Sequence, residues 1–355
     1  MAVPLPVPTD VEHKFAHLPA NFRSAYRVCR DFEAFSLTSK NSQSIISARV
    51  LGYLLLHAPS DQALAEVVAT IHSCNADHDS LHSLGDAFVN WFIRAFRQYK
   101  GGTPATSERS SRSSFDRDHS LLNVSVEEAP KDHIAAQGQA LKRDGYRCQV
   151  SGRYDALANT VLKLPLEILL EYGSAVNTEC AHIVPASTYF DVNTGESTHD
   201  TSKRDYAASV LAVLKCSGYD IEKLKGANVH SLFNVMTLEY DVHYRFDKLQ
   251  LWLEATNTPN QYRIRVADPC YATPRRELVT FSTSDPVHLP LPSAELLALH
   301  ATCAKVAHLS GAAEYLDNME RRLKVSQVLA SDGSSAAVLH YAIAGLAGDG
   351  IHVGA

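Results

Sequence analysis

The sequence lacks the paired cysteines that build disulfide frameworks and structural zinc sites. Its seven cysteines are scattered along 355 residues, an odd number without any Cys-x-x-Cys pair. They are Cys29, Cys74, Cys148, Cys180, Cys216, Cys270 and Cys303. Such usage is typical of reduced thiols in an intracellular protein and argues against a zinc knuckle. We expect Cys148 and Cys180 to be small, buried, apolar side chains.

Targeting and membrane-spanning segments are also lacking. The chain begins MAVPLPVPTDVEHKF, without the basic and apolar regions of a secretory signal. No uninterrupted run of about 18 apolar residues offers a membrane-spanning helix. The sequence therefore predicts an intracellular protein, cytoplasmic or nuclear and not secreted, that has no membrane partner.

The sequence also lacks an excess of positive charge. The formal net charge is −6, and residues 141–270 hold 14 lysines and arginines against 16 aspartates and glutamates. A protein that grips duplex DNA normally shows a basic surface, so the charge by itself does not favour DNA. Basic residues do cluster locally, and we interpret each cluster as a solvated face: Lys142, Arg143, Arg147 and Arg153; Lys203 and Arg204; Lys223 and Lys225.

Periodicity and composition predict an α+β protein of about two domains. The segments are an N-terminal helical region (1–99), a flexible linker rich in Gly, Ser, Thr and Arg (100–134), a central domain (135–268) with a helical insertion (190–230), a C-terminal helical region (269–330) and a mobile tail (331–355). Helix starts are expected at Ser60 and at Ser293.

Within the central domain, local patterns predict the elements individually. A helix is expected over 135–147, a strand over 176–182, and a hairpin formed by 249–254 and 261–266. The mostly apolar stretch 162–170 is expected to run beneath the candidate functional site that is described next.

Chemistry-bearing residues fall in two short motifs, CAHIVP at 180–185 and LFNVMTLEYDVHYRFD at 232–247. His182 ends the predicted strand, and Asn234 is interpreted as entering a helix. His243 and Asp247 are four residues apart, so they share one helical face on which a divalent cation could bind. Phosphodiester hydrolysis needs an activated water and such a cation, and a neutral imidazole can accept the water's proton.

These motifs resemble the HNH endonuclease family, most closely its fungal branch, whose segments read RD-x-YRC-x-x-SG, AHI-x-P and N-x(8)-H-x-x-FD. The three pieces here are 143–152, 181–185 and 234–247, and the resemblance covers roughly residues 135 to 268. It implies a ββα-metal (His-Me finger) core and a DNA substrate. It also implies that His182 is the general base, that Asn234 braces the loop of His182 or, in some branches, touches the metal, and that His243 and Asp247 are metal ligands.

One position departs from many members of the family. They carry a His or an Asp just before the catalytic histidine as a metal ligand, whereas this chain has Ala181. Waters, Asn234, Glu179 or another residue would complete the shell. Such an oxygen-rich shell favours Mg²⁺ or Mn²⁺, while the His243 imidazole also suits Zn²⁺.

Two alternatives stay open. Because the metal shell is thin and the chain is acidic, the cleft could act on a small molecule or a peptide, bound in an apolar pocket under the insertion. The helical layers could instead make the protein a non-catalytic interaction module. Individually, His182 would usually be a packed core histidine, and His243 with Asp247 a surface pair worth a few tenths of a kcal/mol.

Overall fold

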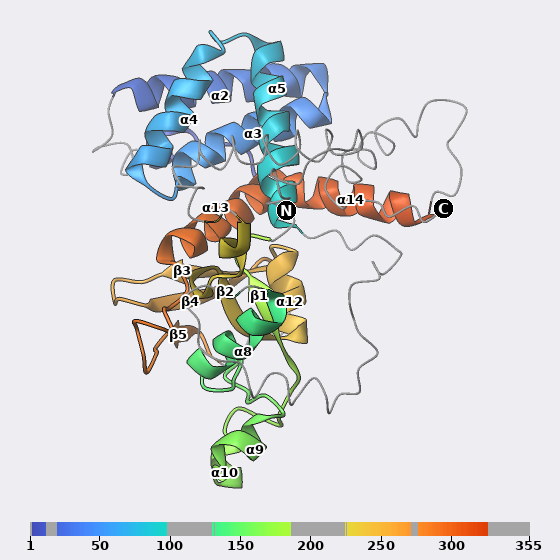
Figure 1. Ribbon diagram of the computed structural model, residues 1–355. Coiled ribbons are helices and arrows are strands. Elements are labelled where there is room, and N and C mark those ends of the chain that lie inside the picture. The colour runs from blue at the N-terminus through green and yellow to red at the C-terminus, as the bar shows by residue number, and fades with distance from the viewer. Residues whose placement is uncertain are drawn as a thin grey trace, which may run out of the picture. The chain divides into compact units, whose positions relative to one another are not determined.

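The computed structural model describes residues 2–11, 20–97, 130, 132–185, 224, 226–270 and 276–325 (Figure 1). The predicted linker lies outside the described residues except for 130 and 132–134. The same holds for the predicted insertion, except for 224 and 226–230, and for the whole predicted tail. Helices and small antiparallel sheets together make the described part an α+β structure.

The chain divides into two compact units, and the boundary between 301 and 302 falls inside helix α13 (Ala294–Ser310). One unit takes in 1–99, 190–221 and 302–355, and the other takes in 100–189 and 222–301. Both predicted motifs lie in the second unit. The described helices include none that is both long and apolar enough to cross a lipid bilayer.

The first unit is helical in its described residues. Its elements are η1 (Pro8–Val11), α2 (Ala20–Ser39), α3 (Ser42–His57), α4 (Asp61–Ser73), α5 (His78–Phe88), the π-helical η2 (Val89–Ile93), α6 (Arg94–Phe96) and α14 (Ala312–Val325). The predicted start at Ser60 is confirmed, because its side chain accepts a hydrogen bond from the Ala63 amide. Helices α3 and α5 bury large apolar side chains, among them Leu51, Leu54 and Phe88.

The second unit contains an antiparallel strand pair followed directly by a helix. Strand β1 (Thr178–His182) pairs with β2 (Val235–Glu239), and His182 lies opposite Val235. Helix α12 (Tyr240–Asp247) follows β2 without a gap and contacts both strands. The predicted strand that ends at His182 is confirmed.

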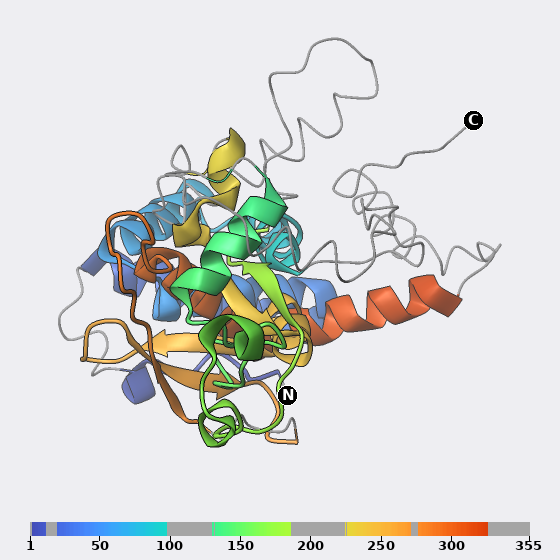
Figure 2. The ribbon, with the colours of Figure 1, turned by 60° about the horizontal axis from the view of Figure 1, so that its bottom comes forward.

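Helix α8 (His133–Arg143) packs on the same strand pair (Figure 2). Its Ala136 and Ala140 form an apolar cluster with Cys180 of β1 and Val235 of β2. Successive side chains of a strand point to opposite faces, so even-numbered positions of β1 face α8 and odd-numbered positions face α12. Cys148 and Cys180 are buried as expected.

A second sheet is built from the predicted hairpin and one further strand. Strands β3 (Leu251–Ala255), β4 (Gln261–Val266) and β5 (Leu278–Thr280) lie in that order and are antiparallel. Helix α13 begins after Ser293, as expected, because the Ser293 hydroxyl accepts a hydrogen bond from the Leu296 amide.

Three local predictions are wrong. Asn234 enters strand β2 rather than a helix, since it ends the short η6 (Leu232–Asn234) and its carbonyl extends the β1–β2 ladder by accepting from the Ile183 amide. The helix expected over 135–147 ends at Arg143, because Gly145 and Tyr146 have positive φ. The apolar stretch 162–170 holds the last residue of α9 (Ala158–Leu162) and all of α10 (Leu166–Leu169), and its Leu166, Ile168 and Leu170 are exposed rather than beneath the site.

Candidate active site

His182 ends β1 within a cluster of three histidines. It is only 8% exposed, and its Nε2 shares a hydrogen bond of 3.0 Å with Nδ1 of His230, the last residue of η5 (Gly226–His230). The ring of His133, the first residue of α8, stacks on His182 at a centroid distance of 5.5 Å. One nitrogen from each ring lies within 4.8 Å of the other two. Among the described residues, these three histidines are the one group of three or more His, Cys, Asp or Glu side chains that lie close enough together to hold a metal ion.

The cluster holds its imidazoles in the neutral form. Burial, together with the neighbouring rings of His133 and His230, lowers the pKa of His182 to about 3. Desolvation by the surrounding protein also lowers the pKa of His230 and of His133, although part of the His133 side chain is exposed. His182 is therefore neutral near pH 7, which is the protonation state that a general base requires.

Asn234 ties together the two segments that carry His182 and His230. Its Nδ2 donates hydrogen bonds to the carbonyls of Val184 and Val229, at 3.0 and 2.8 Å, and its Oδ1 accepts from the Val184 amide at 2.9 Å. The side chain is fully buried. An amide is the side chain that can donate to two carbonyls and accept from an N–H at once, so asparagine satisfies the buried backbone groups on both sides.

His243 lies between two carboxylates on the other face of β1. Its Nδ1 donates to Oε2 of Glu179 at 2.8 Å, and its Nε2 lies 3.5 Å from Oδ1 of Asp247, one turn along α12. Burial lowers the pKa of His243, but the hydrogen bonds to Asp247 and Glu179 outweigh burial and raise it to about 9.

The pair of His243 and Asp247 fits a hard divalent cation. Glu179 holds Nδ1–H, so Nε2 beside the Asp247 carboxylate is the nitrogen that would bind a cation once the cation displaces its proton, the usual arrangement for a metal-binding histidine with a carboxylate partner. Glu179 and Asp247 face different nitrogens of the His243 ring. Glu179 therefore orients His243 and does not replace the metal ligand that many family members carry at the position of Ala181. Mg²⁺ commonly binds through one or two protein ligands and keeps several waters.

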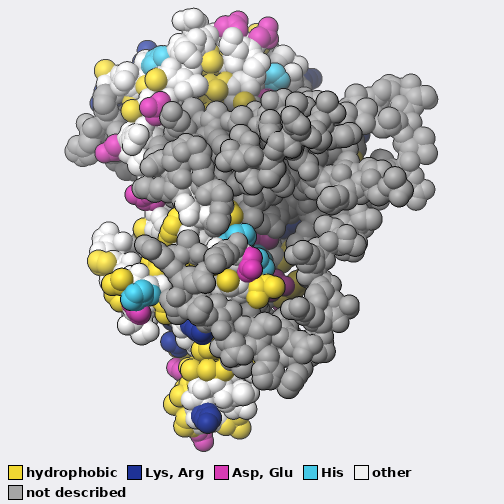
Figure 3. Space-filling model, in the orientation of Figure 1, with side chains coloured by type: hydrophobic (Ala, Val, Ile, Leu, Met, Phe, Trp, Pro, Cys, Tyr) yellow, Lys and Arg dark blue, Asp and Glu magenta, His cyan; other side chains and the backbone are white. Residues whose placement is uncertain are grey.

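The four predicted site residues lie in two neighbouring clusters. His182 and Asn234 belong to one cluster and His243 and Asp247 to another. Among the described residues no hydrogen bond or ion pair joins the two clusters, but His243 contributes to the lowered pKa of His182. Histidine and acidic side chains gather on the surface over β1 and α12 (Figure 3).

Sequence reasoning missed His133 and His230. His230 lies two residues before the motif at 232–247 and four before Asn234, so its proximity to that motif was a usable signal. His133 had no local signal, because α8 brings it to His182 only through the packing of Ala136 and Ala140 on the strands.

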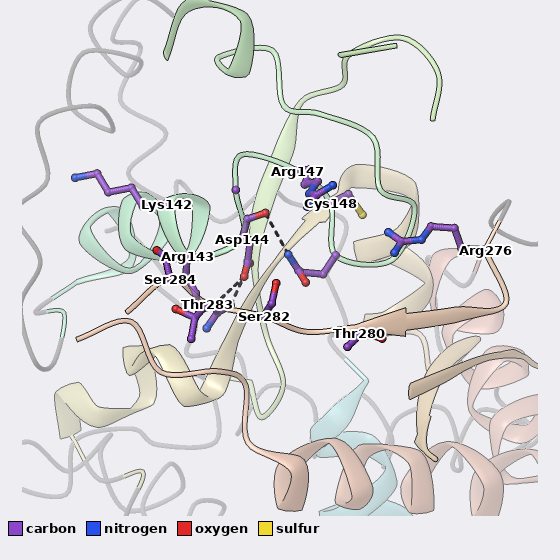
Figure 4. Close-up of a pocket in the computed structure, with 12 residues that line it drawn as sticks. Lys142, Arg143, Asp144, Arg147, Cys148, Arg276, Thr280, Ser282, Thr283 and Ser284 are labelled. Atoms are coloured by element: carbon purple, nitrogen blue, oxygen red, sulfur yellow. Dashed lines mark hydrogen bonds and ion pairs between the residues drawn. The ribbon is translucent and has the colours of Figure 1, made fainter. Parts of the chain in front are cut away.

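A polar cavity of about 210 Å³ lies at the other end of α8. Figure 4 shows its lining, which comes from the end of α8, the turn after it, β5 and the segment beyond β5. Basic and hydroxyl side chains predominate: Lys142, Arg143, Arg147, Arg276, Thr280, Ser282, Thr283 and Ser284. The guanidinium group of Arg147 lies over the ring of Tyr154, and that of Arg276 lies over the ring of Tyr172. Neither arginine forms an ion pair with a carboxylate of the described residues.

Arg143 is buried, so its interpretation as a solvated basic residue is wrong. It pairs with Asp144 at 2.7 Å and donates to the carbonyls of Leu232 and Val235. Asp144 in turn accepts from the Thr237 amide. This pair fixes the end of α8 to β2. Because Arg143 neutralises Asp144, the acidic residue of the cavity, the charge that remains in the lining is the positive charge of Lys142, Arg147 and Arg276.

Residues 148–254 match the family model of HNH endonucleases. This chain carries an HNH endonuclease domain. The matched segment includes His182, Asn234, His243 and Asp247, whereas His133 precedes it. A domain of this family suggests nuclease activity in general. The fungal branch stays a prediction. A search of curated proteins and a search of solved structures each found no match.

Proposed function

We propose that the protein is a divalent-metal-dependent endonuclease that hydrolyses phosphodiester bonds in DNA. The catalytic core is the ββα-metal unit formed by β1, β2 and α12. The observation that carries the proposal is a buried, neutral His182 at the end of β1 beside a helix that presents His243 and Asp247 together. The HNH match over the same residues supports it.

In this proposal His182 takes a proton from the attacking water. Its imidazole is neutral at cellular pH, and an anionic phosphodiester bound beside the ring would raise its pKa toward neutrality. His230 holds the ring through the shared hydrogen bond, and Asn234 keeps both segments in register. A positioned general base contributes about 10²- to 10⁴-fold to the rate.

His243 and Asp247 would hold the cation, with Mg²⁺ or Mn²⁺ as the ions that suit the pair. When bound, the cation neutralises charge on the phosphate and on the leaving oxygen. Glu179 keeps Nε2 of His243 directed to the metal position by accepting from Nδ1–H. Asp247 adds a carboxylate oxygen one helical turn away.

The polar cavity supports a polyanionic substrate. Helix α8 has His133 at its first residue and Arg143 at its last, so the histidine cluster and the cavity are separated by roughly 15 Å along the helix axis. This length corresponds to about four nucleotides of a duplex strand. A cavity lined by cations and hydroxyls suits phosphate oxygens better than the apolar ligand that the small-molecule alternative requires.

The proposal is tested by nicking of supercoiled plasmid in Mg²⁺ or Mn²⁺. We expect His182→Ala to reduce the rate by at least about 10²-fold while its melting temperature stays near the wild-type value. Asp247→Ala should raise the metal concentration needed for half-maximal cleavage. His288→Ala, which removes an exposed histidine paired with Asp285, is the matched control and should cleave normally. Full activity of purified His182→Ala would remove the proposed mechanism.

A further inference from the structure

The three-histidine cluster has donor chemistry unlike that of the His243–Asp247 pair. His133, His182 and His230 offer three imidazole nitrogens within 4.8 Å of one another and no carboxylate oxygen. Imidazole donors suit zinc and its neighbours in the transition series, whereas magnesium prefers carboxylates and water. One small protein unit thus holds two neighbouring donor sets with opposite metal preferences.

Each histidine of the cluster is held by a separate, anchored element. His133 opens α8 directly after Asp132, whose side chain caps the helix by accepting from the Ala135 amide at 2.8 Å. His182 is fixed by its place in the β1–β2 ladder. His230 follows Val229, whose carbonyl accepts from Asn234. Anchored ligands lose little conformational freedom when an ion binds, which favours binding.

The spacing of the nitrogens is close to that of a zinc site. Nitrogens about 2.0–2.1 Å from a tetrahedral ion lie roughly 3.4 Å apart. Nε2 of His182 and Nδ1 of His230 are 3.0 Å apart, and the His133 nitrogen completes a triangle within 4.8 Å. Shifts of less than a bond length bring all three nitrogens to one ion.

We propose that His133, His182 and His230 form a zinc-class metal site, distinct from the hard-cation site on α12, whose occupation removes His182 from its role as general base. The ring that donates the hydrogen bond between His182 and His230 moves its proton to its other nitrogen. No net proton is lost, because the imidazoles stay neutral. The effect on cleavage rests on the proposed nuclease function, but the binding of the ion does not.

Binding is tested on the full chain by zinc titration against a chromophoric chelator in excess Mg²⁺, and by the visible absorption of bound Co²⁺. Wild type should bind one zinc equivalent that Mg²⁺ does not displace. His133→Ala and His230→Ala should each weaken it by more than about tenfold, the smallest loss seen for outer partners of a metal ligand. His288→Ala should bind like wild type and controls for surface histidines, and thiol binding is common to all variants.

His133→Ala carries little risk of misfolding, because His133 is exposed in the first turn of α8. Its melting temperature should match that of wild type. Unchanged zinc affinity in folded His133→Ala and His230→Ala, or displacement of the zinc by Mg²⁺, would overturn the proposed site.

The consequence for cleavage is tested separately. Zinc added to the Mg²⁺ reaction should suppress nicking by wild type and by His288→Ala, whereas any nicking by His133→Ala should resist the same zinc concentration. Unchanged or stimulated wild-type nicking with the site occupied would overturn the inhibitory role. If wild type does not cleave DNA at all, the nuclease proposal fails while the titration still decides whether the metal site exists.

Discussion

At the scale of single residues, the site depends on side chains that fix others in place. Asn234 joins two backbone segments, Glu179 sets the nitrogen that His243 presents, and Arg143 with Asp144 fixes α8 to β2. The sequence motifs contain the proposed site residues, but these supporting contacts are tertiary. Only the role of Asn234 as a brace was predicted, and the observed hydrogen bonds fit that role.

Replacing Asn234 should separate His182 from His230. Asn234→Ala leaves the buried groups of Val184 and Val229 without partners, and we expect a loss of about 2–4 kcal/mol in the free energy of unfolding. Asn234→Asp keeps the acceptor but places a carboxylate against two carbonyl oxygens, so it should also destabilise. Urea denaturation measures both. A change below about 0.5 kcal/mol, typical of surface substitutions, would show that the brace is not needed.

Glu179 should be required for metal affinity although it is not a ligand. Glu179→Ala removes the acceptor of His243 Nδ1–H, so the ring can rotate, and we expect Mn²⁺ or Mg²⁺ affinity to fall about 10- to 100-fold by calorimetry. Glu277→Ala, an exposed acidic residue in the same unit, is the matched control. Equal metal affinity in the two variants would mean that Glu179 does not position His243.

At the scale of elements, local sequence patterns predicted the features that depend on residues close together in the sequence. The cap at Ser60 and the hairpin of β3 and β4 were both predictable from short windows. Packing decided the rest. Asn234 fills a place in the β1–β2 ladder that no window reveals, and His133 reaches His182 because α8 covers the strand pair.

The junction of α12 and α13 should make stability depend on pH. His300 of α13 stacks on Phe246 of α12 at 3.7 Å, and its Nε2 donates to the Phe246 carbonyl. Burial lowers the pKa of His300 from 6.5 to about 3. Between these pH values His300 is protonated in the unfolded chain but stays neutral in the folded chain. The free energy of unfolding therefore falls as the pH falls.

His300→Phe should reduce this acid sensitivity. The slope of the free energy of unfolding against pH should be shallower by up to about 1.4 kcal/mol per pH unit between pH 6 and pH 4. Urea denaturation at several pH values measures the slope. Parallel profiles for wild type and His300→Phe would contradict the account of this junction.

At the scale of the whole molecule, the distribution of charge matters more than its sum. The net charge of −6 argues against DNA as a substrate, and the sequence alone left that conflict open. The structure brings Arg147 and Arg276, distant in sequence, to one cavity with Lys142. A local basic site can bind phosphate groups within an acidic protein.

Arg147→Ala and Arg276→Ala should weaken DNA binding almost uniformly across sequences. Each should reduce the slope of log affinity against log salt concentration by about one. Fluorescence anisotropy with a short duplex in EDTA separates this binding from cleavage. Arg263→Ala, an exposed arginine on the hairpin, is the matched control. An unchanged slope in both cavity variants would exclude this cavity as the phosphate site.

The most direct measurement is chemical rescue of the residue on which cleavage is proposed to depend. His182→Gly should lose cleavage of labelled duplex DNA in Mg²⁺, and added imidazole should restore part of it by taking the vacated place of the ring. His288→Gly should cleave normally and show no response to imidazole. Cleavage by His182→Gly at the wild-type rate without imidazole would contradict the account.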